Sequence, residues 1–144
     1  MTAMRFMMLM IPKGYESAAP GTMPEDEKAL QAMMRYNEQL QKAGVLLALD
    51  GLHPAEYGAR VEFAGGGTST ITDGPYAEAK EIVGGYWIID VRSKDEAVEW
   101  ASRAPMNEGD VIEVRQVAEL ADFPADVQEA ARPPQTPPGP SVAR

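Results

Sequence analysis

The side chains best suited to chemistry in this chain of 144 residues are its single histidine, His53, and the charged group that begins at Asp73. Histidine has an ordinary pKa near neutrality, which suits a general base. Asp73 would orient the imidazole if the chain around it folds over the strand that ends before His53. We therefore take His53 and Asp73 as candidate catalytic residues. The alternative is that His53 caps a strand end or packs under a loop.

Glu113 and Arg115 form a second candidate site, two residues apart on a predicted strand from 111 to 117. Alternate residues of a strand share one face, so these two side chains lie side by side. They can pair with each other, or the guanidinium can bind the carboxylate of a ligand. We take both as candidate ligand-binding residues. The alternative is a salt bridge that holds a dimer or the Asp73 turn.

The stretch from 73 to 81 reads DGPYAEAKE and predicts a stiff turn with several charges. Aspartate can accept from backbone amides two residues on, glycine tolerates positive φ, and proline fixes its own φ near about −65°. Such a turn holds its polar side chains in a defined arrangement. Tyr76, Glu78 and Lys80 are therefore further candidates for ligand binding. The alternative is an ordinary surface turn with solvated charges.

The elements that must position these residues follow from apolar periodicity and turn signals. Helices are expected from residue 25 to 43 and from 93 to Pro105, each opened by a capping box, at Thr22–Glu25 and Ser93–Glu96. The expected strands are 6–11, 45–52, 60–63, 68–72, 86–91 and 111–117. Gly65–Gly67 is interpreted as a hairpin turn, since neither a Lys-Ser/Thr pair nor a helix follows as a phosphate loop requires.

This order predicts an α+β fold of the ferredoxin-like type, β-α-β-β-α-β, with two helices on one face of an antiparallel sheet. The first strand is apolar on both sides, so the second face of the sheet also needs a cover. A second copy of the chain is the simplest cover, which predicts a homodimer with the two sheets face to face. Glu113 and Arg115 would then line a cavity between the two copies.

Composition restricts the classes of function. The net charge of −9, with 13 lysines and arginines that form no cluster, disfavours nucleic acid and anionic membranes as partners. The chain contains no cysteine, which excludes disulfides, thiolate nucleophiles and cysteine-ligated metals. The methionines near the start share a strand with apolar neighbours and suit a core better than a soft-metal site. We predict neither a metal nor a cofactor.

The domain is expected to span residues 1–123, followed by a flexible, proline-rich tail from 124 to 144. Its short PxxP sequence, Pro134 to Pro137, leaves open a docking role for the tail. The apolar start is too short for a signal peptide or a membrane span, so a cytoplasmic protein is predicted.

The stretch Asp73–Glu81 resembles the Asp-Gly-Pro-Phe motif of YCII-related (DGPF-domain) proteins. The resemblance covers about residues 4 to 120, and it extends to Gly84-Gly85-Tyr86, Glu96-Ala97 and Glu113-Val114-Arg115. Tyr76 replaces the phenylalanine of the motif, and Gln116 replaces the proline expected after Arg115.

The resemblance implies a dimeric α+β barrel. Some YCII relatives are similar to small lyase-like or dehydrochlorinase-like enzymes with a His–Asp pair in the dimer cavity, and DGPF proteins accompany extracytoplasmic-function sigma factors. Two functions therefore remain open. One is an acid–base enzyme acting on a small molecule in a dimer cavity, and the other is a ligand-sensing or partner-binding module associated with a sigma-factor-type protein.

Overall fold

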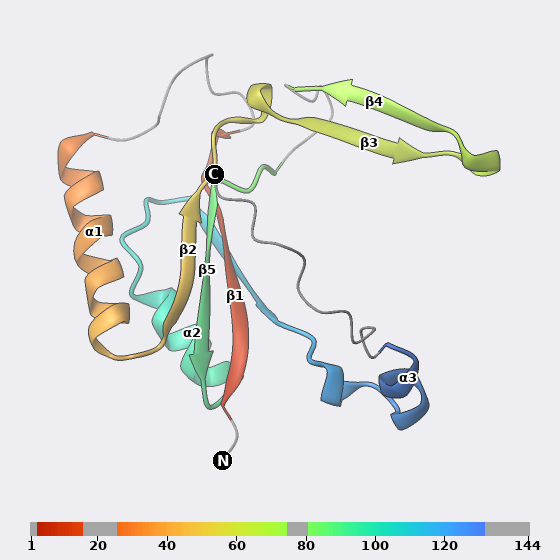
Figure 1. Cartoon of the computed structure of the whole chain (residues 1–144). Helices are drawn as coiled ribbons and strands as arrows, with labels where there is room; N and C mark the ends of the chain where they lie inside the picture. Colours follow the sequence, from red (N-terminus) through yellow and green to blue (C-terminus); the bar gives the residue numbers. More distant parts are fainter. Residues whose placement is uncertain (1–2, 16–25, 75–80, 132–144) are drawn as a thin grey trace, which may run out of the picture.

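The structure is a computed structural model that describes residues 3–15, 26–74 and 81–131. This part of the chain forms an α+β fold with a four-stranded sheet, a separate two-stranded hairpin and three α-helices (Figure 1). In chain order the elements are β1 (Met4–Ile11), α1 (Glu27–Lys42), β2 (Leu46–Gly51), the 3-10 turn η2 (Ala55–Tyr57), β3 (Ala59–Phe63), the 3-10 turn η3 (Gly65–Gly67), β4 (Ser69–Asp73), β5 (Gly85–Val91), α2 (Lys94–Ser102), β6 (Val111–Gln116), the 3-10 turn η4 (Leu120–Asp122) and α3 (Ala125–Ala130).

The main sheet has the strand order β2-β5-β1-β6, and every neighbouring pair is antiparallel. This is the ferredoxin-like order, with the β3–β4 hairpin inserted between the second and third strands of the motif. The α+β fold class predicted from the sequence is therefore confirmed. β1 lies in the middle of the sheet, so its residue Met7 has Ile88 on one side and Arg115 on the other.

Helices α1 and α2 cover the same face of this sheet, which we call the covered face (Figure 1). Alternation along β5 sends Trp87, Ile89 and Val91 into the core between sheet and helices. The Tyr36 and Trp87 rings are nearly perpendicular, with 5.7 Å between ring centroids. The Tyr36 hydroxyl donates to the Trp100 carbonyl over 2.6 Å, so the polar end of this buried ring is satisfied.

The helix starts follow local capping chemistry. α2 begins after Ser93, whose hydroxyl accepts from the Glu96 amide over 3.1 Å, as its sequence predicts. α1 begins after Asp26, whose side chain accepts from the Ala29 amide over 2.7 Å. The expected capping box at Thr22–Glu25 lies outside the described residues, and Asp26 is the cap of the helix.

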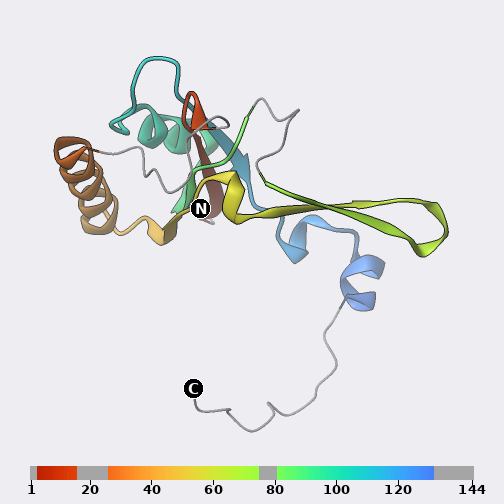
Figure 2. The same cartoon turned by 90° about the horizontal axis from the view of Figure 1, so that it is seen from above.

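The β3–β4 hairpin and the segment after β6 extend away from the side that carries α1 (Figure 2). Every residue of β3 and β4 is exposed, although Val61 and Ile71 lie opposite each other on one side of the hairpin. The segment expected to be a tail from 124 begins with the short helix α3, whose N-cap is Pro124. A proline is tolerated at such a start because the first amides of a helix have no partner there. Residues 132–144 lie outside the described part.

Candidate functional site

The Asp73–Gly74 corner closes the base of the β3–β4 hairpin against η2. The Gly74 amide donates to the Gly58 carbonyl over 3.0 Å. A Cβ at Gly74 would lie 1.7 Å from the Ala55 carbonyl oxygen, a separation that no side chain can adopt. Glycine is therefore required here by a close backbone contact. Tyr76, Glu78 and Lys80, the ligand-binding candidates of the same stretch, lie outside the described residues.

His53 lies between β2 and η2, with its ring exposed and tilted by 42° against Tyr57 at 4.9 Å between centroids. Asp73 is also exposed, and its partner across the hairpin is Ala59. Within the described part of the chain, no hydrogen bond joins His53 to Asp73, and the His53 ring contacts Tyr57. Their pairing as a catalytic dyad therefore stays a prediction.

Glu113 and Arg115 lie on the sheet face opposite the helices, which we call the open face. Arg115 Nη1 lies 3.3 Å from Glu113 Oε2, with 70% and 49% of the two side chains exposed. Their neighbours on β1 are Met7 and Leu9, which are half-buried. The two charges thus pair with each other, one of the two arrangements that their spacing predicts.

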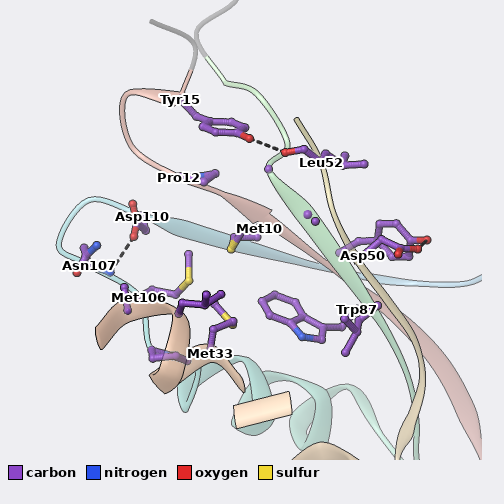
Figure 3. A pocket seen from close by; sticks show the side chains of 18 of the residues that line it. Met10, Pro12, Tyr15, Met33, Asp50, Leu52, Trp87, Met106, Asn107 and Asp110 are labelled. Atoms are coloured by element: carbon purple, nitrogen blue, oxygen red, sulfur yellow. Dashed lines mark hydrogen bonds between the residues drawn. The ribbon is translucent and has the colours of Figure 1, made fainter. Parts of the chain in front are cut away.

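A cavity of about 380 Å³ lies on the covered side of the sheet, at one end of β1, β2 and β5. We call it the Trp87 cavity. α1 forms one wall and the loop from 105 to 110 forms another. The apolar residues of its lining include Met10, Leu30, Met33, Leu49, Trp87 and Met106. Figure 3 shows Trp87, Met10, Met33 and Met106 around the same space, on three elements and a loop.

Hydrogen bonds fix the polar part of this wall. Trp87 Nε1 donates to Asn37 Oδ1 over 2.8 Å. The Asp110 carboxylate accepts from the Lys13 amide over 2.8 Å and from the Asn107 amide over 2.7 Å. The Tyr15 hydroxyl donates to the Leu52 carbonyl over 2.5 Å (Figure 3). The cavity therefore has a preformed shape.

Asp50 borders the cavity, but its side chain lies on the other side of the strands from the Trp87 ring (Figure 3). Asp50 is paired with Tyr86, which alternates with Trp87 along β5 and therefore belongs to the open face. The Tyr86 hydroxyl donates to Asp50 Oδ2 over 2.7 Å. This hydrogen bond raises the pKa of Tyr86 above its ordinary value.

The wall residues of the Trp87 cavity were not among the residues chosen from the sequence. In the sequence, Asn37 could have indicated this cavity. It is a polar residue in the apolar stripe of α1, together with Leu30 and Met33. An apolar stripe predicts a buried helix face, and an amide within it needs a polar partner. The partner is the Trp87 indole, on a strand 50 residues further along the chain.

Among the described residues, no group of three or more His, Cys, Asp or Glu side chains is arranged to hold a metal ion. In the same ranges, no helix has both the length and the apolar character needed to cross a membrane.

The sheet order and the Trp87 cavity define a ferredoxin-like α+β domain with a preformed cavity between sheet and helices. The chain belongs to the YCII-related domain family, whose match covers residues 4–121. It is 34% identical over 77 residues to an uncharacterised protein of Rhizobium meliloti (strain 1021). The matched region is 54% of this chain and 61% of that relative. The family predicted from the sequence is thus confirmed.

Proposed function

We propose that this YCII-related chain is a small-molecule-binding protein and that its ligand occupies the Trp87 cavity. The observation that carries this proposal is the cavity of about 380 Å³ with an indole and three thioethers in its wall. Ligand sites are typically concave, about 300–1,000 Å³ in volume, and mostly apolar with a few polar groups. Methionine side chains adapt to the shape of a ligand, and their sulfur atoms contact aromatic rings favourably.

The state of the ionisable groups favours binding over acid–base catalysis. In the described wall of the cavity, the Asp110 carboxylate is held by two backbone amides, and the Asp50 side chain points to the open face. His53 and Asp73 are not among the described residues that line it. These observations support the binding-module class. An association with a sigma-factor-type protein rests on the family resemblance alone.

The protein is further proposed to act as a homodimer through the open face. The half-buried residues Met7, Leu9 and Ile88 lie side by side there, and the described helices α1 and α2 lie on the other face. A contiguous apolar sheet face is a typical site of association, and two copies of one face are self-complementary about a two-fold axis. The paired Glu113 and Arg115 would then lie within the dimer.

The cavity assignment is tested with the uncharged fluorescent probe N-phenyl-1-naphthylamine, whose emission rises in apolar surroundings. Leu30→Trp places a bulkier side chain at the cavity wall, at a residue that is 49% exposed. Leu120→Trp is the matched control, since Leu120 is 47% exposed and is not among the lining residues. We expect Leu30→Trp to weaken probe binding by about tenfold or more, because the indole occupies part of the cavity and a loss of about 1.5 kcal/mol of apolar contact to the probe has that effect. Equal binding by both variants would contradict the proposal.

A further inference from the structure

The Trp87 cavity contains a hydrogen-bond donor with a fixed direction. An indole N–H only donates, so the amide oxygen of Asn37 must face Trp87 Nε1, as their distance of 2.8 Å shows. The Asn37 NH₂ group consequently points away from the indole. Among the described residues it makes no hydrogen bond. Asn37 lines the cavity and is half-buried, so this NH₂ group is available to a ligand.

The described charges of the cavity wall disfavour a charged ligand. Two carboxylates, Asp50 and Asp110, and one ammonium, Lys13, border the cavity. The whole chain carries a net charge of −9, which repels anions over longer distances. Each Asp110 oxygen already accepts from one backbone amide, which weakens its attraction for a cation. An uncharged ligand avoids the cost of transferring an ion into an apolar space.

From these observations, and resting on the proposed function of the cavity, we propose that the Trp87 cavity selects an uncharged aromatic carbonyl compound. Its planar ring lies among Trp87 and the methionines, and its carbonyl oxygen accepts a hydrogen bond from Asn37 Nδ2. The stacking preference of aromatic rings and their contacts with thioether sulfur favour the ring. The fixed donor supplies selectivity, because a ligand without an acceptor covers the NH₂ group and leaves it unpaired.

The test measures the affinity of 2-acetylnaphthalene and of 2-isopropylnaphthalene by quenching of tryptophan emission in Trp100→Phe protein. The two probes have nearly the same shape, and only the first has an acceptor. We expect the ketone to bind about tenfold more tightly, the effect of one hydrogen bond. 2-Naphthoate, an anion of similar size, should bind more weakly than the ketone. Tighter binding of 2-naphthoate would overturn the preference for an uncharged ligand.

Asn37→Asp is the informative variant, since a carboxylate still accepts from Trp87 Nε1 but offers no donor to the ligand. It should remove the preference for the ketone and leave the affinity for 2-isopropylnaphthalene within about twofold. Gln31→Glu is the matched control, because it makes the same change of an amide to a carboxylate at an exposed position of α1. This control should alter neither affinity.

The outcomes separate the two proposals. If both probes bind equally and Asn37→Asp changes neither affinity, the ligand class is wrong while the cavity remains a binding site. If neither probe binds and N-phenyl-1-naphthylamine does not bind either, the proposed function itself is wrong. If Asn37→Asp does not fold, the affinities of the two probes for the protein that retains Asn37 still decide the ligand class.

Discussion

The two faces of the main sheet differ although the same strands build them. On β5, Ile89 and Trp87 face the helices and are buried, whereas Ile88 and Tyr86 face the other way and are half-buried. The covered face also has the Trp87 cavity at one end, and the open face has the Glu113–Arg115 pair. One face therefore combines the core with a proposed ligand site, and the other is proposed to bind a second copy of the chain.

The largest difference between the faces is expected for two neighbouring isoleucines. Ile89→Ala should lower the free energy of unfolding by about 2–5 kcal/mol, because Ile89 is fully buried and its loss leaves a cavity. The matched change Ile88→Ala should cost less at low protein concentration, and its cost should grow as the concentration rises. Urea unfolding at two concentrations measures both. If both variants lose the same free energy of unfolding at both protein concentrations, the two faces do not differ as described.

The dimer is tested by a charge on the open face. Ile88→Lys should weaken dimerisation by at least about a hundredfold, since burying an unpaired ammonium costs several kcal/mol. Light scattering on a sizing column distinguishes a protomer of 15.6 kDa from a dimer. Val98→Lys is the control, because Val98 lies on α2 on the covered side and is 43% exposed. A wild-type protein that stays monomeric at all concentrations would refute the homodimer.

Two tyrosine hydroxyls provide a smaller contrast. Tyr36→Phe should lower the free energy of unfolding by about 0.5–1.5 kcal/mol, because the Trp100 carbonyl loses the hydroxyl as a donor and keeps the Arg103 amide. At a protein concentration low enough to keep the chain monomeric, Tyr86→Phe should leave stability nearly unchanged, since the exposed Asp50 carboxylate can bind water in place of the hydroxyl. Thermal unfolding of both variants at neutral pH measures the difference. A larger loss for Tyr86→Phe would contradict the assignment of the two faces.

A further expected effect is a dependence of stability on alkaline pH. Burial raises the pKa of Tyr36 to about 12, whereas an unfolded tyrosine has a pKa of about 10. The folded protein therefore binds more protons between these values, and its stability falls as the pH rises from about 10 to 12. Below about pH 10 the contribution is fully present. The stability difference between wild type and Tyr36→Phe should shrink across this range, and a constant difference would contradict the role of Tyr36.

The order of elements was predictable from the sequence because apolar periodicity reports which face of a strand or helix is buried. The strand expected from 86 to 91 is β5, whose residues alternate between buried and half-buried. The predicted ends of the helices were less accurate than the predicted order of the elements. The helix expected from 25 to 43 spans Glu27–Lys42, and its N-cap is Asp26. Near residue 124, alanines and prolines together predicted a tail, yet Ala125–Ala130 forms a short helix.

The Trp87 cavity was not predictable in the same way. Met10, Asn37, Trp87 and Met106 come from a strand, a helix, another strand and a loop, and they meet only after the sheet has formed. Periodicity shows that each side chain points inward, but a void depends on how well the side chains of different elements fill the space. The residues chosen from the sequence as most suited to chemistry, His53 above all, are not among the described residues that line this cavity.

The most direct test of the ligand site uses the methionine methyl groups, of which the chain has nine. In a spectrum of protein labelled at these methyl carbons, Met10, Met33 and Met106 report on the Trp87 cavity, and Met7 reports on the open face. On titration with 2-acetylnaphthalene, the signals of the three cavity methionines should shift while that of Met7 stays in place. A shift of Met7 alone would place the ligand between the two sheets and contradict the account.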